Sequence, residues 1–279
     1  MDRTIKNIIK QALGEDVGSG DITTGAIIPT DTTAKGVFIV KEPGIIAGLE
    51  IAEEVFKQVD ENIRFDRFFE EGSAVNKGDK VAAVLGKAQS LLIAERTALN
   101  FLQRMSGIAT ATRAYVNAVL HTKAKILDTR KTAPGLRFLD KMAVKIGGAE
   151  NHRMGLYDMF LIKDNHIAVA GSLTEAVKAC QRYRQQKSAD WRIEVETDTL
   201  SQVEEAIHCN VDMIMLDNFS LEDIKKAVSV INGRCKIEAS GGVSLENVKA
   251  IAKTGVDYIS VGALTHSVKA LDISFDIVL

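Results

Sequence analysis

The 279-residue chain contains few residues of the kinds that mark unusual classes of protein. It has three prolines, and 46% of its residues are hydrophobic, a composition that excludes a disordered chain and a collagen-like repeat. Its three cysteines, Cys180, Cys209 and Cys235, are far apart and include no Cys-x-x-Cys pair, so neither a zinc site nor a redox dithiol is expected. The composition predicts a globular protein of one large or two moderate domains, with reduced structural thiols.

Long apolar runs and an excess of charge of one sign are also missing. The longest run without a charged residue, counting histidine as neutral, is Tyr258–Val268, well short of the roughly 20 residues that a membrane helix needs. The 35 basic and 37 acidic residues leave a net charge of −2, which attracts neither nucleic acid nor an anionic membrane. Residues 1–6 include charged side chains where a secretory signal peptide would have its hydrophobic segment. We therefore expect a cytoplasmic protein.

Residues 32–92 have the pattern of a small α+β sandwich. Short β-rich runs at 36–40, 63–69 and 80–85 surround one helical segment at 49–59. An amphipathic helix over residues 4–13 precedes them, and two helices, at 90–104 and 108–120, follow. We therefore expect an N-terminal α+β sandwich domain with a linking helix over residues 1–107 and a second domain over residues 108–279, with the boundary near Gly107.

From Ala124 onward, β-branched runs alternate with helical stretches, which predicts a parallel sheet covered by helices. The six predicted strands are 124–127, 159–162, 192–196, 212–216, 236–239 and 257–261. The ends of the last four predicted strands recur at nearly constant intervals along the sequence, and the interval is typical of a β/α barrel. An eight-stranded barrel takes about 250 residues, and far fewer remain after Ala124. We expect a short, incompletely closed β/α barrel of about six strands, with its chemistry at the carboxyl ends of the strands.

Cations gather after the first two barrel strands. They are Arg130, Lys131, Lys163 and the segment Asn151–Arg153. In a chain of slightly negative net charge, this cluster predicts a local site for a ligand with two or more carboxylates or phosphates, because arginine contacts such groups through two parallel hydrogen bonds. A surface ion-pair network is the alternative interpretation.

Carboxylates and glycines end the later strands. Other residues can cap the helices that follow Glu196 and Asp217, so these two carboxylates are available for sugar hydroxyls, a metal ion or a positively charged transition state. The loops Ser240–Gly242 and Gly262–His266 lie where barrels often form a phosphate site from backbone N–H groups and a helix N-terminus.

Several strings of the sequence closely resemble the quinolinate phosphoribosyltransferase family, also called nicotinate-nucleotide pyrophosphorylase (carboxylating). They are Glu15–Thr23, Glu95–Asn100, Asp128–Thr132, Asn151–Arg153, Leu161–His166, Leu216–Asn218 and Val261–Ser267. The resemblance covers nearly the whole chain. It implies transfer of phosphoribosyl from phosphoribosyl pyrophosphate to the ring nitrogen of quinolinate, with loss of the 2-carboxylate, to give nicotinate mononucleotide, CO₂ and pyrophosphate for NAD synthesis.

The resemblance also implies roles for individual residues. The quinolinate-binding residues would be Arg96, Arg130, His152, Arg153 and Lys163. The residues that bind phosphoribosyl pyrophosphate would be Lys131, Glu196, Asp217, Ser240, Gly241, Gly262 and His266. The catalytic residues among these would be Lys131, Glu196 and Asp217. Mg²⁺ is the implied cofactor, bound through the pyrophosphate and not by direct protein ligands. A homodimer, or a higher oligomer, is implied as well, with Arg96 in the neighbouring subunit's site.

Three other functions fit parts of the pattern. A paralogue associated with molybdate uptake shares the fold and many motifs. A barrel isomerase or lyase acting on a phosphorylated substrate would account for the two glycine loops, but not for the cations after the early strands. A non-catalytic metabolite sensor would be expected to lose Glu196 or Asp217, and both are present.

Overall fold

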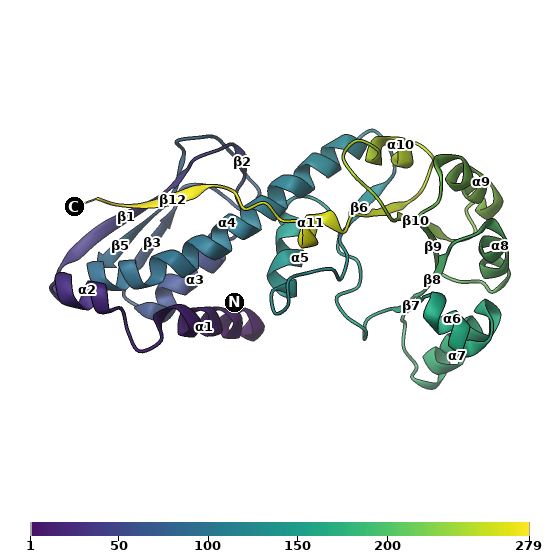
Figure 1. Ribbon diagram of the computed structural model, residues 1–279, viewed down its shortest axis with the longest axis horizontal. Helices are drawn as coiled ribbons and strands as arrows, with labels where there is room; N and C mark the ends of the chain where they lie inside the picture. The colour runs from purple at the N-terminus through teal and green to yellow at the C-terminus, as the bar shows by residue number, and fades with distance from the viewer. Residues whose placement is uncertain (1, 279) are drawn as a thin grey trace. The chain divides into compact units, whose positions relative to one another are not determined.

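The computed structural model describes residues 2–278, which divide into two compact units (Figure 1). The first unit contains the residues up to Arg113, the segment Thr132–Gly148, and the residues from Ser267 onward. The second contains Ala114–Lys131 and Ala149–His266. The units therefore interleave along the chain, whereas the sequence predicts two continuous domains that meet at residue 107.

An antiparallel sheet of four strands is the centre of the first unit. Its order is β12 (Ile273–Val278), β1 (Thr33–Val40), β5 (Lys80–Lys87) and β3 (Arg64–Arg67). The other elements are α1 (Arg3–Val17), α2 (Ile22–Ile27), the short pair β2 (Gly44–Ile45) and β4 (Ala74–Val75), α3 (Leu49–Val59), α5 (Arg137–Ile146) and α4 (Ala88–Val119), whose residues after Arg113 belong to the second unit. The predicted α+β architecture, including the helix at 49–59, is confirmed. Phe38 of β1 packs against Phe56 of α3 and Phe275 of β12, with ring centroids 6.0 and 4.8 Å apart.

The two helices predicted on either side of Gly107 are one continuous helix, α4. A Cβ atom at Gly107 would lie 2.1 Å from the carbonyl oxygen of Lys269. The glycine therefore allows the C-terminal segment to pass close to the helix, and it does not end the helix. The prediction of a break at this position was wrong because the sequence alone does not distinguish a packing glycine from a terminating one.

Two segments assigned to the barrel by the linear division belong to the first unit. β12 pairs antiparallel with β1, from Lys35 opposite Val278 to Val40 opposite Ile273. α5 is tied to α4 by two hydrogen bonds, of 2.8 and 2.9 Å, that Arg104 donates to the fully buried carboxylate of Asp140. These contacts place both segments in the first compact unit.

The second unit is built on six parallel strands in the order β6–β11–β10–β9–β8–β7. They are β6 (Lys125–Leu127), β7 (Phe160–Ile162), β8 (Ile193–Thr197), β9 (Met213–Asp217), β10 (Lys236–Ser240) and β11 (Tyr258–Ser260). All six were predicted to within one residue at each end. β6 and β7 are the edges of the sheet, so the barrel is incompletely closed, as expected.

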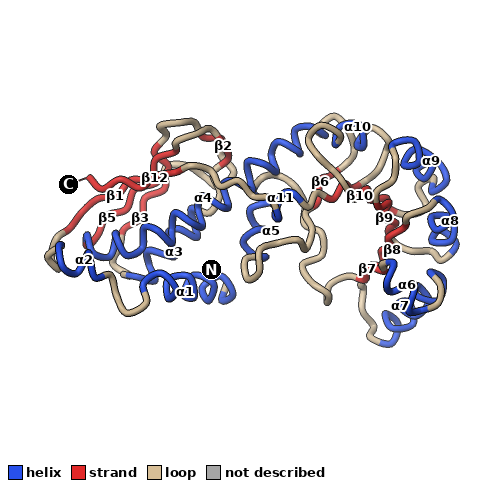
Figure 2. Tube along the Cα trace, in the orientation of Figure 1, coloured by secondary structure: helices blue, strands red, loops and turns tan. Residues whose placement is uncertain are grey.

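Helices surround the curved sheet of this unit, as Figure 2 shows by colour. They are α6 (Asp164–Ala170), α7 (Leu173–Gln186), α8 (Leu200–His208), α9 (Leu221–Ile231), α10 (Val248–Ala252) and α11 (Ala263–His266). Across residues 2–278, no helix combines the length and apolar character needed to cross a membrane.

The alternation of side chains along the barrel strands decides which residues meet at the sheet's carboxyl edge. Glu196 on β8 and Asp217 on β9 lie at the ends of neighbouring strands, and Ser240 on β10 is paired with Asp217. Residues two positions earlier on a strand point to the same face. Glu194 therefore lies one layer below Glu196, and Glu238 one layer below Ser240.

Candidate active site

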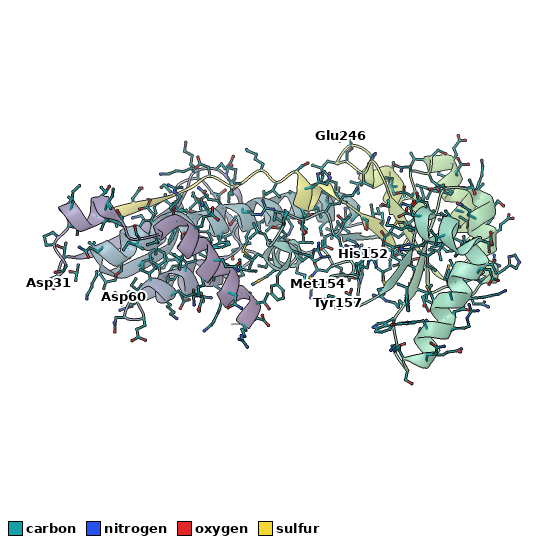
Figure 3. The ribbon with its side chains drawn as sticks, turned by 60° about the horizontal axis from the view of Figure 1, so that its bottom comes forward. Asp31, Asp60, His152, Met154, Tyr157 and Glu246 are labelled. Carbon is teal, nitrogen blue, oxygen red and sulfur yellow. The ribbon has the colours of Figure 1, made fainter. Side chains whose placement is uncertain are left out.

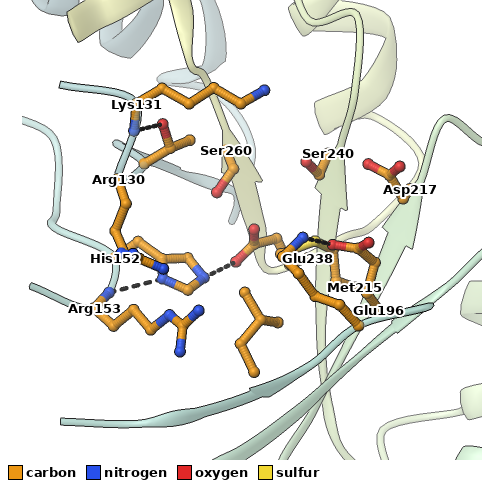
Figure 4. Close-up of a pocket in the computed structure, with 13 residues that line it drawn as sticks. Arg130, Lys131, His152, Arg153, Glu196, Met215, Asp217, Glu238, Ser240 and Ser260 are labelled. Carbon is orange, nitrogen blue, oxygen red and sulfur yellow. Dashed lines mark hydrogen bonds and ion pairs between the residues drawn. The ribbon is translucent and has the colours of Figure 1, made fainter. Parts of the chain in front are cut away.

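A pocket of about 420 Å³ lies at the carboxyl ends of the barrel strands, within the second unit (Figure 4). Its lining residues are Thr129, Arg130, Lys131, His152, Arg153, Leu161, Lys163, Glu196, Met215, Asp217, Glu238, Ser240 and Ser260. Eight of the twelve residues predicted for the site thus meet in one cavity. Figure 4 shows Arg130 and Arg153 on one side of it, and Glu196 and Asp217 on the other.

Arg130 and Arg153 both line the pocket, and each has a buried hydrogen-bond donor without a partner among the described residues. The Nε atom of each is buried without a hydrogen-bond partner among the described residues, while Nη1 of Arg153 donates to the carbonyl oxygen of Met159 at 3.2 Å. Burial and the nearby charge of Arg130 lower the pKa of Arg153. Because two partly desolvated guanidinium groups repel each other, a bound anion would stabilise both.

Lys131 is held at the edge of the pocket by its main chain. Its backbone N–H donates to Oγ1 of Thr129 at 3.1 Å, and its carbonyl oxygen accepts from Oγ1 of Thr265 at 2.8 Å. A Cβ atom on Gly262 would lie 3.3 Å from Cδ of Lys131. The loop after β11 therefore lies beside the exposed lysine side chain, where a phosphate group could contact both.

The two predicted carboxylates have different partners. Glu196 forms an ion pair with Lys163, so a cation from the end of β7 meets an anion from the end of β8. Asp217 accepts a hydrogen bond of 2.8 Å from the side-chain amide of Asn218. Both carboxylates line the cavity at the position where the strands end, so they are available to hydroxyl groups of a ligand.

Four of the predicted residues do not line the pocket. Gly241 directly follows β10, Gly262 precedes α11 and His266 ends that helix; a Cβ atom on Gly262 would lie 3.1 Å from Cδ2 of His266. These three residues therefore lie at the same edge of the sheet, two in loops and His266 at the end of the short helix α11. Arg96 is an exposed residue of α4 in the first unit.

Sequence reasoning missed two carboxyl groups at the floor of the pocket. Glu194 and Glu238 are completely buried, with 0% of each residue exposed, and Glu238 lines the cavity. The signal that could have found them is the strand alternation, because each stands two residues before a predicted site residue, Glu196 or Ser240. The predicted site consisted of strand ends and loops, so it did not include the layer below them.

His152 connects these glutamates to the cationic side of the pocket. Its Nε2 atom lies 3.0 Å from Oε2 of Glu194 and 3.4 Å from Oε2 of Glu238. Its Nδ1 atom accepts a hydrogen bond of 2.7 Å from the backbone N–H of Arg153. Since Nδ1 acts as an acceptor, the ring hydrogen lies on Nε2 and points to the glutamates. Both ring nitrogens therefore have protein partners, although the ring lines the predicted quinolinate site.

The segment before β7 supplies this histidine. Figure 3 shows it with His152, Met154 and Tyr157 labelled. The backbone N–H of His152 donates to Oδ1 of the buried Asp128 at 2.9 Å, and Asp158 accepts from the backbone N–H of Met154 at 2.7 Å. These contacts fix the main chain on both sides of Arg153.

In the described part of the chain, His152, Glu194 and Glu238 are the one group that brings three possible metal ligands together, with their ligand atoms within 4.8 Å. With its hydrogen on Nε2, the imidazole offers no lone pair to a metal on that side. The group also differs from the oxygen-only, partly hydrated site that Mg²⁺ prefers. It therefore does not fit a protein-held Mg²⁺.

The two buried glutamates have unusual acidity. Burial raises the pKa of Glu194 to about 8. Burial also raises the pKa of Glu238 to about 8, and the nearby charge of Glu194 adds to that rise. Two carboxyl groups that face one histidine N–H cannot both ionise easily, so protons are retained in the pair near neutral pH.

Comparisons with known proteins cover both units. The family described as "Quinolinate phosphoribosyl transferase, N-terminal domain" matches residues 21–106, and the one described as "Quinolinate phosphoribosyl transferase, C-terminal domain" matches residues 108–276. A quinolinate phosphoribosyltransferase [decarboxylating] 1b from Nicotiana tabacum is 48% identical, across 98% of this chain and 82% of the relative. A probable nicotinate-nucleotide pyrophosphorylase [carboxylating] from Bacillus subtilis is 44% identical, across 99% and 94%.

Solved structures agree with these matches. The nicotinate-nucleotide pyrophosphorylase from Ehrlichia chaffeensis has a TM-score of 0.93 and 45% identity, with both chains covered completely. The enzyme of the same name from Francisella tularensis also has a TM-score of 0.93, with 40% identity, and the match covers 99% of this chain and 96% of that one.

An α+β unit and an open β/α barrel, with a pocket lined by arginine, lysine and carboxylate side chains at the carboxyl ends of its strands, are typical of a phosphoribosyltransferase of the barrel type. The chain belongs to the quinolinate phosphoribosyl transferase family, because the two family matches cover most of its length and relatives share more than 40% of its residues.

Proposed function

We propose that the chain transfers phosphoribosyl from phosphoribosyl pyrophosphate to the ring nitrogen of quinolinate, with loss of the 2-carboxylate. The products are nicotinate mononucleotide, CO₂ and pyrophosphate, which places the reaction in NAD synthesis. The observation that carries the proposal is a single pocket with Arg130 and Arg153 on one side and the carboxylates of Glu196 and Asp217 on the other. The relatives carry the words "decarboxylating" and "carboxylating" in their names.

The cationic side of the pocket suits quinolinate. Two neighbouring carboxylates on a flat ring require several donors, and Arg130 and Arg153 supply them from adjacent segments. Lys163 adds a third cation, which is paired with Glu196 until a ligand competes for it. His152 lines this side and orients the main chain of Arg153 through the hydrogen bond to its Nδ1 atom.

The acidic side suits the ribose. When pyrophosphate leaves, positive charge develops on the sugar ring, and carboxylates held close to it stabilise that charge. Glu196 and Asp217 lie at adjacent strand ends, where they can bind ribose hydroxyls. Lys131, at the edge of the pocket, is assigned to the departing pyrophosphate.

The remaining phosphate contacts are assigned to the loops after β10 and β11. The residues proposed for them are Ser240, Gly241, Gly262 and His266. Mg²⁺ is proposed to enter with the pyrophosphate oxygens, since it often keeps several waters and binds through substrate phosphates. Among the described residues, His152, Glu194 and Glu238 form the one cluster of three acidic, histidine or cysteine ligands. When bound, Mg²⁺ would neutralise charge on the leaving pyrophosphate.

A homodimer with shared sites completes the proposal. Arg96 is exposed and outside the lining of the pocket, and it is assigned to the site of the neighbouring subunit. An apolar groove lined by exposed Leu156 and Val169 lies next to Arg153, and a surface of this kind favours association. The cytoplasmic location expected from the sequence is part of the same proposal.

The decisive experiment is incubation of the folded protein with quinolinate, phosphoribosyl pyrophosphate and Mg²⁺, followed by detection of nicotinate mononucleotide and CO₂. Product should form from quinolinate and far more slowly from nicotinate, which lacks the 2-carboxylate and would leave cations of the pocket unpaired. Absence of product from folded protein would favour a different substrate, as in the molybdate-associated paralogue.

A further inference from the structure

Burial of Glu194 and Glu238 under the pocket is energetically unfavourable when both are ionised. Both residues are completely buried, and Oε1 of Glu194 and both oxygens of Glu238 lack a hydrogen bond of good geometry among the described residues. The two carboxyl groups lie close to each other, and the Ser260 hydroxyl beside Glu238 favours its ionised form. The Nε2–H group of His152 faces the pair, 3.0 Å from Glu194 and 3.4 Å from Glu238. Two ionised carboxylates in this position would be poorly compensated, so the arrangement is stable only when the pair holds at least one proton.

A bound dicarboxylate substrate favours protonation of the glutamate pair further. The pocket is lined by Glu238 as well as by the guanidinium groups that would bind a carboxylate, and Arg153 is close enough to Glu194 to influence its ionisation. A ligand dianion placed against Arg130 and Arg153 partly cancels the cations that stabilise an ionised glutamate. It also adds negative charge next to the pair, so ligand binding and ionisation of the pair oppose each other.

We propose that Glu194 and Glu238 form a proton-binding pair under the substrate pocket, which takes up a proton when a dicarboxylate binds and which, once protonated, keeps His152 in position below the bound ligand. Both are positioning residues, because they act through His152 and through the charge of the pocket floor. The proposal rests on the function proposed above, since it requires that Arg130 and Arg153 bind a dicarboxylate.

The charged groups around the pair come from several elements. Arg153, Arg192 and the N–H of His152 favour the ionised forms of the glutamates, while Glu196 on the same strand as Glu194 disfavours them. Ser260 on β11 lies beside Glu238. Strand β9 lies between β8 and β10, and its residue paired with Glu238 is the apolar Met215. The effect of burial exceeds that of the surrounding cations.

Calorimetric titration of the intact protein tests the proton uptake directly. The binding enthalpy is measured at pH 8 in two buffers with very different ionisation enthalpies, because the difference between them gives the number of protons taken up. Phthalate is the first probe, since its two adjacent carboxylates resemble those of quinolinate and it has no ring nitrogen to protonate; quinolinate is the second. With pKa values of about 8 before binding, we expect uptake of about half to one proton per site at pH 8, falling towards zero at pH 6.

The variant E238Q identifies the source of the proton. A glutamine has the size and neutrality of the protonated acid but cannot take up a proton, so uptake at pH 8 should fall to less than half of the wild-type number. At pH 9, E238Q should bind phthalate about tenfold more tightly than the wild type, which must first protonate the pair. At pH 6 the two affinities should agree within about twofold. E204Q, at an exposed position on α8, is the matched control and should behave as the wild type.

The outcomes separate this inference from the proposed function. Binding of phthalate and quinolinate with equal enthalpies in the two buffers at pH 8 would overturn the proton-binding pair and leave the enzyme assignment in place. The same holds if E238Q keeps the full wild-type uptake. If neither dicarboxylate binds at millimolar concentration, the proposed function and the inference both fail.

Discussion

At the scale of single residues, Arg153 is expected to contribute to binding of the acid substrate and not to binding of the sugar substrate. Its buried Nε atom is unpaired among the described residues, and a hydrogen bond between a charged group and a carboxylate contributes about 1.5–3 kcal/mol. R153A should therefore raise KM for quinolinate about 10- to 100-fold and change KM for phosphoribosyl pyrophosphate less than about threefold. Steady-state kinetics with each substrate varied in turn will measure both values. R182A, at an exposed position of α7, is the control, and equal changes in both KM values would contradict the assignment.

Glu196 and Asp217 are expected to act mainly on the transition state. If they stabilise positive charge on the ribose, E196Q and D217N should lower kcat by about 100-fold or more while raising either KM less than about fivefold. S240A should instead act mainly on KM: it should raise KM for phosphoribosyl pyrophosphate and change kcat less than E196Q and D217N do. A change confined to KM in E196Q and D217N would show that these carboxylates bind the ground state equally well.

At the scale of elements, the loops after β9 and β10 depend on each other. Gly241 has φ +91°, and a Cβ atom there would lie 2.1 Å from Oδ1 of Asn218, next to the hydrogen bond of 2.9 Å from the Asn218 N–H to the Ser240 carbonyl. Gly242 also has a positive φ, but a Cβ atom added there would meet no other atom within 4 Å. G241A and G242A should share a backbone strain of about 1–2 kcal/mol.

Only G241A should also displace the loop that carries Asn218. We expect it to lower kcat/KM for phosphoribosyl pyrophosphate at least about tenfold more than G242A does, with thermal unfolding measured on both. The double variant N218G/G241A should recover part of the loss, because Asn218 already has φ +57° and tolerates glycine. Equal kinetic effects of the two alanine variants would refute the coupling between the loops.

The elements of the barrel were predictable because their signals are local. Each strand is a short β-branched run at a regular pitch, and each position was right to within one residue. The elements that were missed depend on distant partners. Gly107 looks like a helix end until Lys269 is known to pass beside it, and β12 becomes a strand of the first unit only through its pairing with β1.

The candidate site was predictable to the same extent. Polar strand ends are visible in the sequence, and they supplied six of the pocket's lining residues, while His152 and Arg153 came from the basic segment before β7. Glu194 and Glu238 fall inside predicted strands, where a charged residue reads as an interruption of an apolar run. Their proximity to His152 follows from the order β8–β9–β10 and from the path of the segment before β7, which no local pattern reveals.

At the scale of the whole molecule, the buried pair makes stability depend on pH. The folded pKa of about 8 exceeds the ordinary glutamate value of 4.5 for both residues, so the folded state binds more protons than the unfolded state between these values. The contribution is fully present below about pH 4.5 and is lost as the pH rises through about 8. The melting temperature should therefore fall by about 3 °C or more between pH 6 and pH 9.

The double variant E194Q/E238Q supplies the comparison for this pH dependence. It should flatten the decrease between pH 6 and pH 9 in differential scanning calorimetry, whereas E204Q should keep the wild-type slope. An unchanged slope in the double variant would assign the pH dependence to other groups.

The assembly carries the last prediction, because Arg96 and the pocket lie in different units of one chain. If a dimer shares its sites, R96A and K131A should each be nearly inactive alone, since each lacks one cation of every site. After mixing and subunit exchange, random pairing makes half of the dimers mixed, and each mixed dimer has one intact site of two, so activity should return to roughly a quarter of the wild-type value. If Arg96 served the pocket of its own chain, every site in the mixture would still lack an essential cation. Failure to recover activity, with exchange verified by mass-labelled subunits, would reject the shared site without affecting the family assignment.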